Sequence, residues 1–135
     1  MTTRKFLQTL IILMPMLSAS GYAQQQEVDT WQSANGLYSV MVKSDLNPIT
    51  INQIHSWTLQ LTDAQGQDVT GAGITVKGGM PEHNHGLATA PSISSQGNGS
   101  YQLQGLRFHM PGYWELTLVI THEDVTDTVL ITLNL

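Results

Sequence analysis

Cysteine is absent from the 135 residues of this chain, and basic residues are few. Without cysteine the protein has no disulfide, no thiolate ligand for a metal and no cysteine nucleophile. Five Lys and Arg residues face ten Asp and Glu residues, which gives a net charge of −5. This balance argues against nucleic acid and anionic membranes as partners, because both attract basic surfaces. The fold must therefore depend on packing alone, and any ligand site must use nitrogen, oxygen or thioether groups.

The sequence also lacks an apolar run long enough to span a bilayer comfortably. Its most apolar segment, residues 6–17, follows two basic residues and precedes small residues, Gly21 and Ala23, at the −3 and −1 positions of a cleavage site. This pattern predicts a secretory signal peptide over residues 1–23. No cysteine lies at the cleavage site, which excludes a lipoprotein anchor; an uncleaved membrane anchor is the alternative. We expect an exported, soluble periplasmic protein without a membrane anchor after cleavage.

A helical period is missing from the sequence after residue 23. Residues 24–35 are polar and predict a loose lead-in, and beyond them apolar and polar residues alternate with a period of two. The pattern predicts one domain over residues 36–135, an all-β, antiparallel, immunoglobulin-like β-sandwich of six or seven strands, with a small barrel as the alternative. Trp57 and Trp114 lie on the apolar faces of their strands and are predicted core residues. The predicted strands are 37–43, 55–63, 69–79, 90–96, 100–108, 113–121 and 126–135.

Two short segments concentrate histidine and methionine. The first, KGGMPEHNHG at 77–86, contains two histidines two positions apart, and in an extended segment such residues point to the same side. The second, FHMPGYWE at 108–115, places a histidine and a methionine before a Pro-Gly pair. If strand pairing brings both segments to one end of the sandwich, five donors converge on one metal ion. These donors are Met80, His83, His85, His109 and Met110.

Imidazole and thioether donors without thiolate favour copper. Thioether sulfur prefers Cu(I), whereas imidazole accepts either oxidation state. Zinc is the alternative, with three histidines as ligands and Glu82 as a base, but the sequence has no HExxH or GxSxG motif, and we expect no enzymatic activity. A solvated loop without metal is the other interpretation, and the protein would then be an exported interaction module that binds a partner along the glycine-rich edge 71–79. His55 and His122 have weaker claims as ligands.

The two segments together resemble a known family. The stretches GGMPEHNHG (78–86) and NGSYQLQGLRFHMPGYWEL (98–116) resemble the YtkA-like family of small exported domains. That family is related to FixH-like domains, which are associated with cytochrome oxidase biogenesis and copper handling. The resemblance extends from about His55 to the C-terminus and implies an all-β sandwich with a copper site at the five donors named above. It also implies a protein partner, another periplasmic metal-handling or oxidase-assembly protein, for a copper carrier or tolerance protein.

Overall fold

The structure is a computed structural model, and it describes residues 28–135. The signal peptide predicted for residues 1–23 lies outside the described residues. Within the described residues, nine strands and one 3₁₀ helix follow one another. They are β1 (Asp29–Gln32), β2 (Tyr38–Ser44), β3 (His55–Asp63), β4 (Gly73–Met80), η1 (Pro81–His83), β5 (His85–Gly86), β6 (Ser92–Gly97), β7 (Ser100–Leu106), β8 (Tyr113–His122) and β9 (Val125–Asn134).

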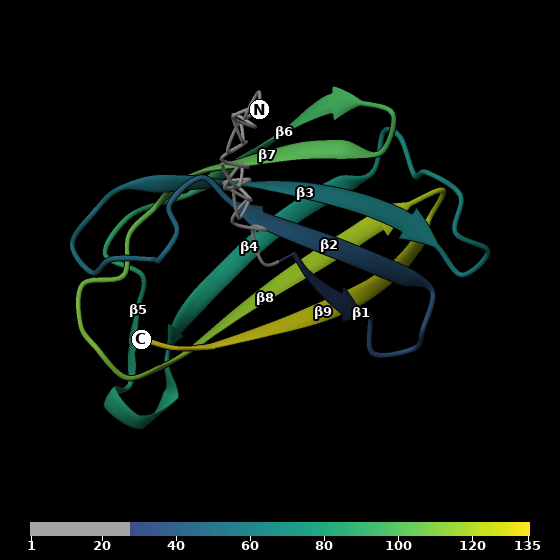
Figure 1. Cartoon of the computed structure of the whole chain (residues 1–135). Helices are drawn as coiled ribbons and strands as arrows, with labels where there is room; N and C mark the ends of the chain where they lie inside the picture. The colour runs from purple at the N-terminus through teal and green to yellow at the C-terminus, as the bar shows by residue number, and fades with distance from the viewer. Residues whose placement is uncertain (1–27) are drawn as a thin grey trace, which may run out of the picture.

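The strands form two antiparallel sheets that pack face to face (Figure 1). One sheet has the order β1-β2-β3-β7-β6 and the other the order β5-β4-β8-β9. The chain passes from one sheet to the other between β3 and β4, between β5 and β6, and between β7 and β8. Such crossings between layers are typical of immunoglobulin-like sandwiches. The predicted all-β sandwich is confirmed.

The number of strands is higher than predicted because two short edge strands add to the expected set. β1 lies inside the polar segment 24–35, for which the sequence predicted no strand. It forms because its backbone pairs with β2, from Asp29 opposite Val42 to Gln32 opposite Ser39. Its side chains are mostly exposed, so no apolar alternation announced it. β5 has only two residues, too few to produce any pattern.

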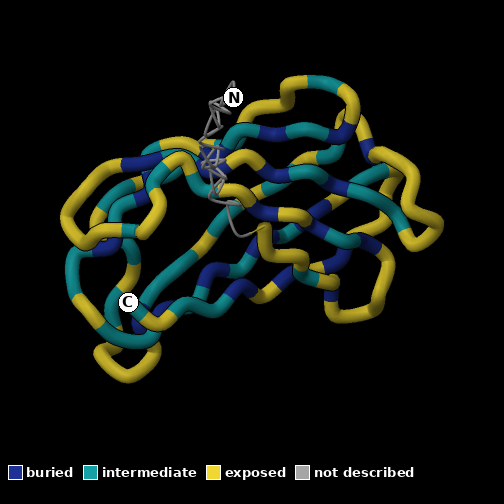
Figure 2. The backbone as a smooth tube through the Cα atoms, viewed as in Figure 1, coloured by how far each residue is buried: buried dark blue, intermediate teal, exposed yellow. Residues whose placement is uncertain are grey.

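The core lies between the two inner faces. β3 contributes Trp57, Leu59 and Leu61, and β8 contributes alternating apolar residues from Trp114 to Ile120, all at most 1% exposed. Figure 2 shows buried residues alternating mostly with half-buried ones along these strands. The period-two pattern therefore predicted the buried faces correctly, and both tryptophans lie in the core as predicted.

The sandwich has two ends with different construction. At one end β8 and β9 join through a two-residue turn, Glu123 and Asp124, with φ of 48° and 64° as the hairpin requires. At the other end, the segment from Met80 to Gly86 lies close to the loop of residues 107–112. That loop is fixed to β9, since Gly112 and Leu135 exchange two backbone hydrogen bonds of 2.7 and 3.0 Å.

No helix among residues 28–135 is both long enough and apolar enough to cross a membrane.

Candidate metal centre

The first histidine segment is a tight reversal at the end of β4. Pro81 begins the single turn η1, and Asn84 ends it in the left-handed conformation, with φ of 52°. The chain then returns as β5, which pairs Gly79 with Gly86 and Met80 with His85. Glycine is required at position 79, because a Cβ there would lie 2.5 Å from the carbonyl oxygen of His85. The reversal thus places His85 directly opposite Met80.

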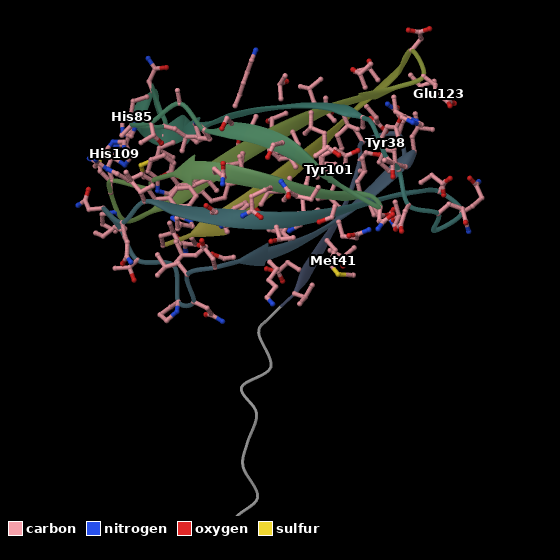
Figure 3. The ribbon with its side chains drawn as sticks, turned by 90° about the horizontal axis from the view of Figure 1, so that it is seen from above. Tyr38, Met41, His85, Tyr101, His109 and Glu123 are labelled. Atoms are coloured by element: carbon pink, nitrogen blue, oxygen red, sulfur yellow. The ribbon has the colours of Figure 1, made fainter. Side chains whose placement is uncertain are left out.

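The second histidine segment meets the first. The rings of His85 and His109 have centroids 4.8 Å apart, and Figure 3 shows both residues together at one end of the molecule. An imidazole that binds an ion at about 2 Å holds its centroid about 3 Å from that ion, so two rings on one ion lie about 4.5 to 6.5 Å apart. The observed separation falls within this range. The expected meeting of the two segments is confirmed.

His83 joins this pair in a way that the sequence did not predict. The segment 83–85 is not extended, because η1 ends at His83 and Asn84 is left-handed. The two rings nevertheless lie close, with centroids 5.9 Å apart and planes inclined by 20°. His83 is exposed, whereas His85 and His109 are half-buried. His83 therefore stands at the rim of the site and the other two form its interior.

Trp114 forms the floor beneath both inner histidines. Its ring lies 5.9 Å from that of His85 and 5.4 Å from that of His109, edge-on in both cases. The indole is fully buried, and its Nε1 donates a 3.0 Å hydrogen bond to the carbonyl oxygen of Met110. Trp114 therefore packs against both imidazoles and, through its hydrogen bond to Met110, fixes the loop of residues 107–112. The sequence identified it only as a core residue, although its position four residues after Met110 could have suggested this contact.

The inner histidines carry nitrogen atoms without partners. His85 Nε2 and His109 Nδ1 are buried and make no hydrogen bond. The other nitrogen of His85, Nδ1, lies 3.2 Å from the carbonyl oxygen of Gly86. If Nδ1 carries the proton for this contact, Nε2 is left with a free lone pair, as in histidines that bind metals. An unpaired buried polar atom is costly, so two on contacting rings indicate a ligand site.

His55 also has a buried and unpaired Nε2. Its ring neighbours, however, are Phe108 at 5.6 Å and Trp57 at 6.3 Å, and neither offers a lone pair to a metal. His55 is thus an isolated core histidine, in agreement with its weaker claim.

The two methionines of the candidate set differ in position. Met80 is 1% exposed, and its Cε lies 2.9 Å from the place that a Cβ on Gly112 would occupy. It therefore reaches from β4 to the loop that follows His109. Met110 is half-buried against the core, and the contact that links it to the site runs through its backbone carbonyl. The Met80 side chain thus contacts the loop of His109, whereas Met110 is linked to Trp114 through its backbone carbonyl.

A pair of carboxylates lies beside the histidines. The Tyr113 hydroxyl donates a 3.0 Å hydrogen bond to Glu115. This bond, together with burial and the negative charges of Glu115 and Glu82, raises the pKa of Tyr113 above its usual value. Glu82 itself is exposed on η1. The carboxylates of Glu82 and Glu115 therefore bring negative charge to the rim of the site, which favours the approach of cations, while Lys77 lines the same pocket as Glu115 and His85.

No group of three His, Asp or Glu side chains within residues 28–135 is arranged to hold a metal ion by itself. The side chains that meet here are two inner imidazoles, with a third imidazole at the rim, and Met80 lies opposite His85 in the strand ladder.

Comparison with known families agrees with this architecture. The family model described as YtkA-like matches residues 32–119, which is more than half of the chain and includes both histidine segments. The chain belongs to the YtkA-like family. The match begins and ends at lower residue numbers than the resemblance seen in the sequence, which extended from about His55 to the C-terminus. Its description does not mention FixH-like domains, so the relation to them stays a prediction. No curated protein and no solved structure matches the chain.

Proposed function

We propose that this YtkA-like protein binds copper at the end of the sandwich where β5 meets the loop 107–112. The observation that carries this proposal is the pair of buried, unpaired nitrogens, His85 Nε2 and His109 Nδ1, on rings 4.8 Å apart. A bound cation would satisfy both nitrogens at once. When both nitrogens lack a proton, neither can donate a hydrogen bond to the other.

The donor types favour copper over other metals. Imidazole nitrogen and thioether sulfur are soft or borderline ligands, and copper is the common biological metal that accepts both. Met80 supplies the thioether, and it is the cross-strand partner of His85. Calcium and magnesium prefer clusters of oxygen ligands. Glu115, which lines the same pocket as His85, already accepts a hydrogen bond from Tyr113.

The exposure of the donors suits a carrier. His83 is exposed and lies 5.9 Å from His85, so it can meet an arriving ion before the inner donors do. Trp114 excludes water from the inner side, because it is fully buried beneath both rings. An ion held between these layers stays within reach of the surface, and a partner can remove it by the same route.

We propose a non-enzymatic role, as an exported copper carrier or tolerance protein of the periplasm. The predicted signal peptide supports export, and the negative rim supports capture of cations. The partner that we propose is another periplasmic metal-handling or oxidase-assembly protein, as the family resemblance implies.

The test is a metal analysis of the protein purified from the periplasm after expression of the full chain. We expect one copper per molecule by native mass spectrometry, or on titration of the apoprotein. The variants His85→Ala and His109→Ala should each lose copper, with a drop in affinity of at least about 100-fold, because each removes a direct ligand. His122→Ala is the matched control, since that residue ends β8 at the opposite end. A protein that binds no copper, or that binds zinc more tightly at the same residues, would contradict the proposal.

A further inference from the structure

We infer that this site selects the monovalent ion, Cu(I), and that the Met80 thioether makes the selection. The inference rests on the proposed function, since it names the form of the cargo that the same site takes. It is carried by the position of Met80, by the charge of the donor set and by the burial of the surrounding residues.

The register of the sheet aims Met80 at the histidine pair. Met80 and His85 are directly opposed in the ladder between β4 and β5. Directly opposed residues of an antiparallel pair have side chains on the same face, with Cβ atoms about 5 Å apart. Met80 is 1% exposed, so this face is the inner one. The contact of His85 with buried Trp114 agrees with that direction.

The far end of the same side chain reaches the other histidine segment. A Cβ built on Gly112 would lie 2.9 Å from Met80 Cε, so the thioether methyl touches the loop that follows His109. The side chain thus begins opposite His85 and ends at the loop of His109. The sulfur atom comes just before the methyl and therefore lies between the segments that carry the two imidazoles. Gly112 leaves the space that this path requires.

The charge of the inner donors favours a single positive charge. Two neutral imidazoles and a thioether bring no negative charge to compensate the ion. The cost of desolvating an ion grows with the square of its charge, so a divalent ion costs about four times as much as a monovalent ion of equal size. Trp114 and Phe108, both fully buried, make the inner side apolar. Cu(I) is also the softer ion and the one that thioether sulfur prefers.

The experiment compares Met80→Leu with Met41→Leu. Leucine has nearly the volume of methionine but offers no sulfur ligand. Met41 is the matched control because it is 47% exposed on β2 and lies away from the histidine end (Figure 3). Cu(I) affinity is measured without oxygen, in competition with a chromophoric Cu(I) chelator, and Cu(II) affinity is measured by titration. Ag(I) serves as a redox-inert substitute for Cu(I).

For the unaltered protein we expect Cu(I) to bind at least about 100-fold more tightly than Cu(II). Met80→Leu should lose about tenfold or more of the Cu(I) and Ag(I) affinity and little of the Cu(II) affinity, while Met41→Leu should change neither. A second readout does not depend on any variant. Ag(I) added to the unaltered protein should shift the Met80 methyl resonance and leave that of Met41 in place.

Two kinds of failure are distinguishable. If the protein binds Cu(II) as tightly as Cu(I), or if Ag(I) leaves the Met80 methyl resonance unmoved, the inference is wrong while the proposed copper site stands. If neither copper ion binds, the proposed function is wrong and this inference falls with it. Should Met80→Leu fail to fold, the methyl resonance of the unaltered protein still decides the matter.

Discussion

At the hairpin end of the sandwich, the buried carboxylate of Asp127 accepts hydrogen bonds from several directions, whereas at the histidine end several buried nitrogens, among them His85 Nε2 and His109 Nδ1, have no partner. The carboxylate of Asp127 accepts a 3.0 Å hydrogen bond from the backbone amide of Asn35 and another of 3.0 Å from the side-chain amide of Asn35. The amide of Thr128 donates to it at 2.8 Å. These bonds fasten the segment after β1 to β9.

The hydrogen bonds at the hairpin end change the pKa of Asp127. Burial alone would raise its pKa, but hydrogen bonds from Ser33, Thr128 and Asn35 outweigh that effect and lower the pKa to about 2. The charged form is therefore fully accommodated by the fold. A polar group whose bonds are all made within the protein stabilises the fold and leaves nothing for a ligand.

The histidine end shows the opposite condition. His85 and His109 bring polar atoms into a buried place and leave them unsatisfied. Buried polar atoms without a hydrogen-bond partner destabilise a fold unless a ligand binds to them. The presence of these atoms in His85 and His109 is therefore more easily explained by function than by stability. The two ends therefore differ in how far the protein itself satisfies its buried polar groups.

The largest expected effect comes from replacing an unpaired imidazole with an apolar ring. His109→Phe should weaken copper binding at least about 100-fold, since it removes a ligand. It should also leave the free energy of unfolding unchanged or raise it by up to about 1 kcal/mol, because phenylalanine has no nitrogen to desolvate. Copper titration and urea denaturation of the apoprotein measure the two effects.

Ser33→Ala is the counterpart at the hairpin end. The Ser33 hydroxyl accepts a 2.8 Å bond from the Tyr38 amide, so its removal should cost about 1 to 2 kcal/mol of stability and leave copper affinity unchanged. The contrast between the two ends breaks down if His109→Phe strongly destabilises the apoprotein or if Ser33→Ala weakens copper binding.

A smaller effect is expected from Gly79→Ala, which tests how the reversal positions His85. The added Cβ would lie 2.5 Å from the His85 carbonyl oxygen, so β5 must move. We expect a loss of about 1 to 3 kcal/mol in the free energy of unfolding from overpacking. Copper affinity should fall about tenfold, because a ligand is misplaced.

Gly73→Ala on the same strand is the matched control for that change. A Cβ at position 73 would meet only the Thr121 carbonyl oxygen, at 3.8 Å, which is an ordinary contact. Stability and copper affinity should stay close to those of the unaltered protein. Equal behaviour of the two alanine variants would show that the close approach of β5 does not position the site.

The smallest effect is a change of stability with pH that belongs to the hairpin end. The pKa of Asp127 is about 2 in the folded protein, below the value of about 3.9 for an unfolded aspartate. Its stabilising contribution is therefore complete above about pH 4 and is lost as the pH falls towards 2. Asp127→Asn should show a weaker decline between these values in urea denaturation. Parallel declines for the two proteins would assign the acid sensitivity to other carboxylates.

Much of the fold could be predicted because side chains in a sandwich alternate between core and solvent. Strands β3 and β8 carry this alternation over nine and ten residues, and their buried faces match the predicted ones. The predicted strands 90–96 and 100–108 are also present as β6 and β7, joined by a turn with Asn98 and Gly99 at positive φ. β1 could not be predicted, because backbone pairing rather than apolar side chains holds it.

The sequence indicated which residues form the candidate site but only part of their arrangement in space. Short His-Met segments in two loops indicated the donors, and the structure places His85 beside His109. The sequence could not separate the inner donors from the rim, because that division depends on η1 and on the left-handed Asn84. It could not reveal the role of Gly112 either, which appears only when the Met80 side chain is followed across the sheet.

The hydrogen bonds that attach the loop of residues 107–112 determine when this end of the sandwich can form during folding. Gly112 is hydrogen-bonded to Leu135, and the carbonyl of Phe108 accepts a 2.7 Å bond from the Asn52 amide, so two distant parts of the chain secure this loop. A polypeptide emerges from the ribosome with its N-terminal part first, and β9 follows β8. Before that last strand docks, Gly112 lacks its two hydrogen bonds to Leu135. We therefore expect the proposed copper site to form only after β9 has docked, so that an incomplete chain binds copper weakly.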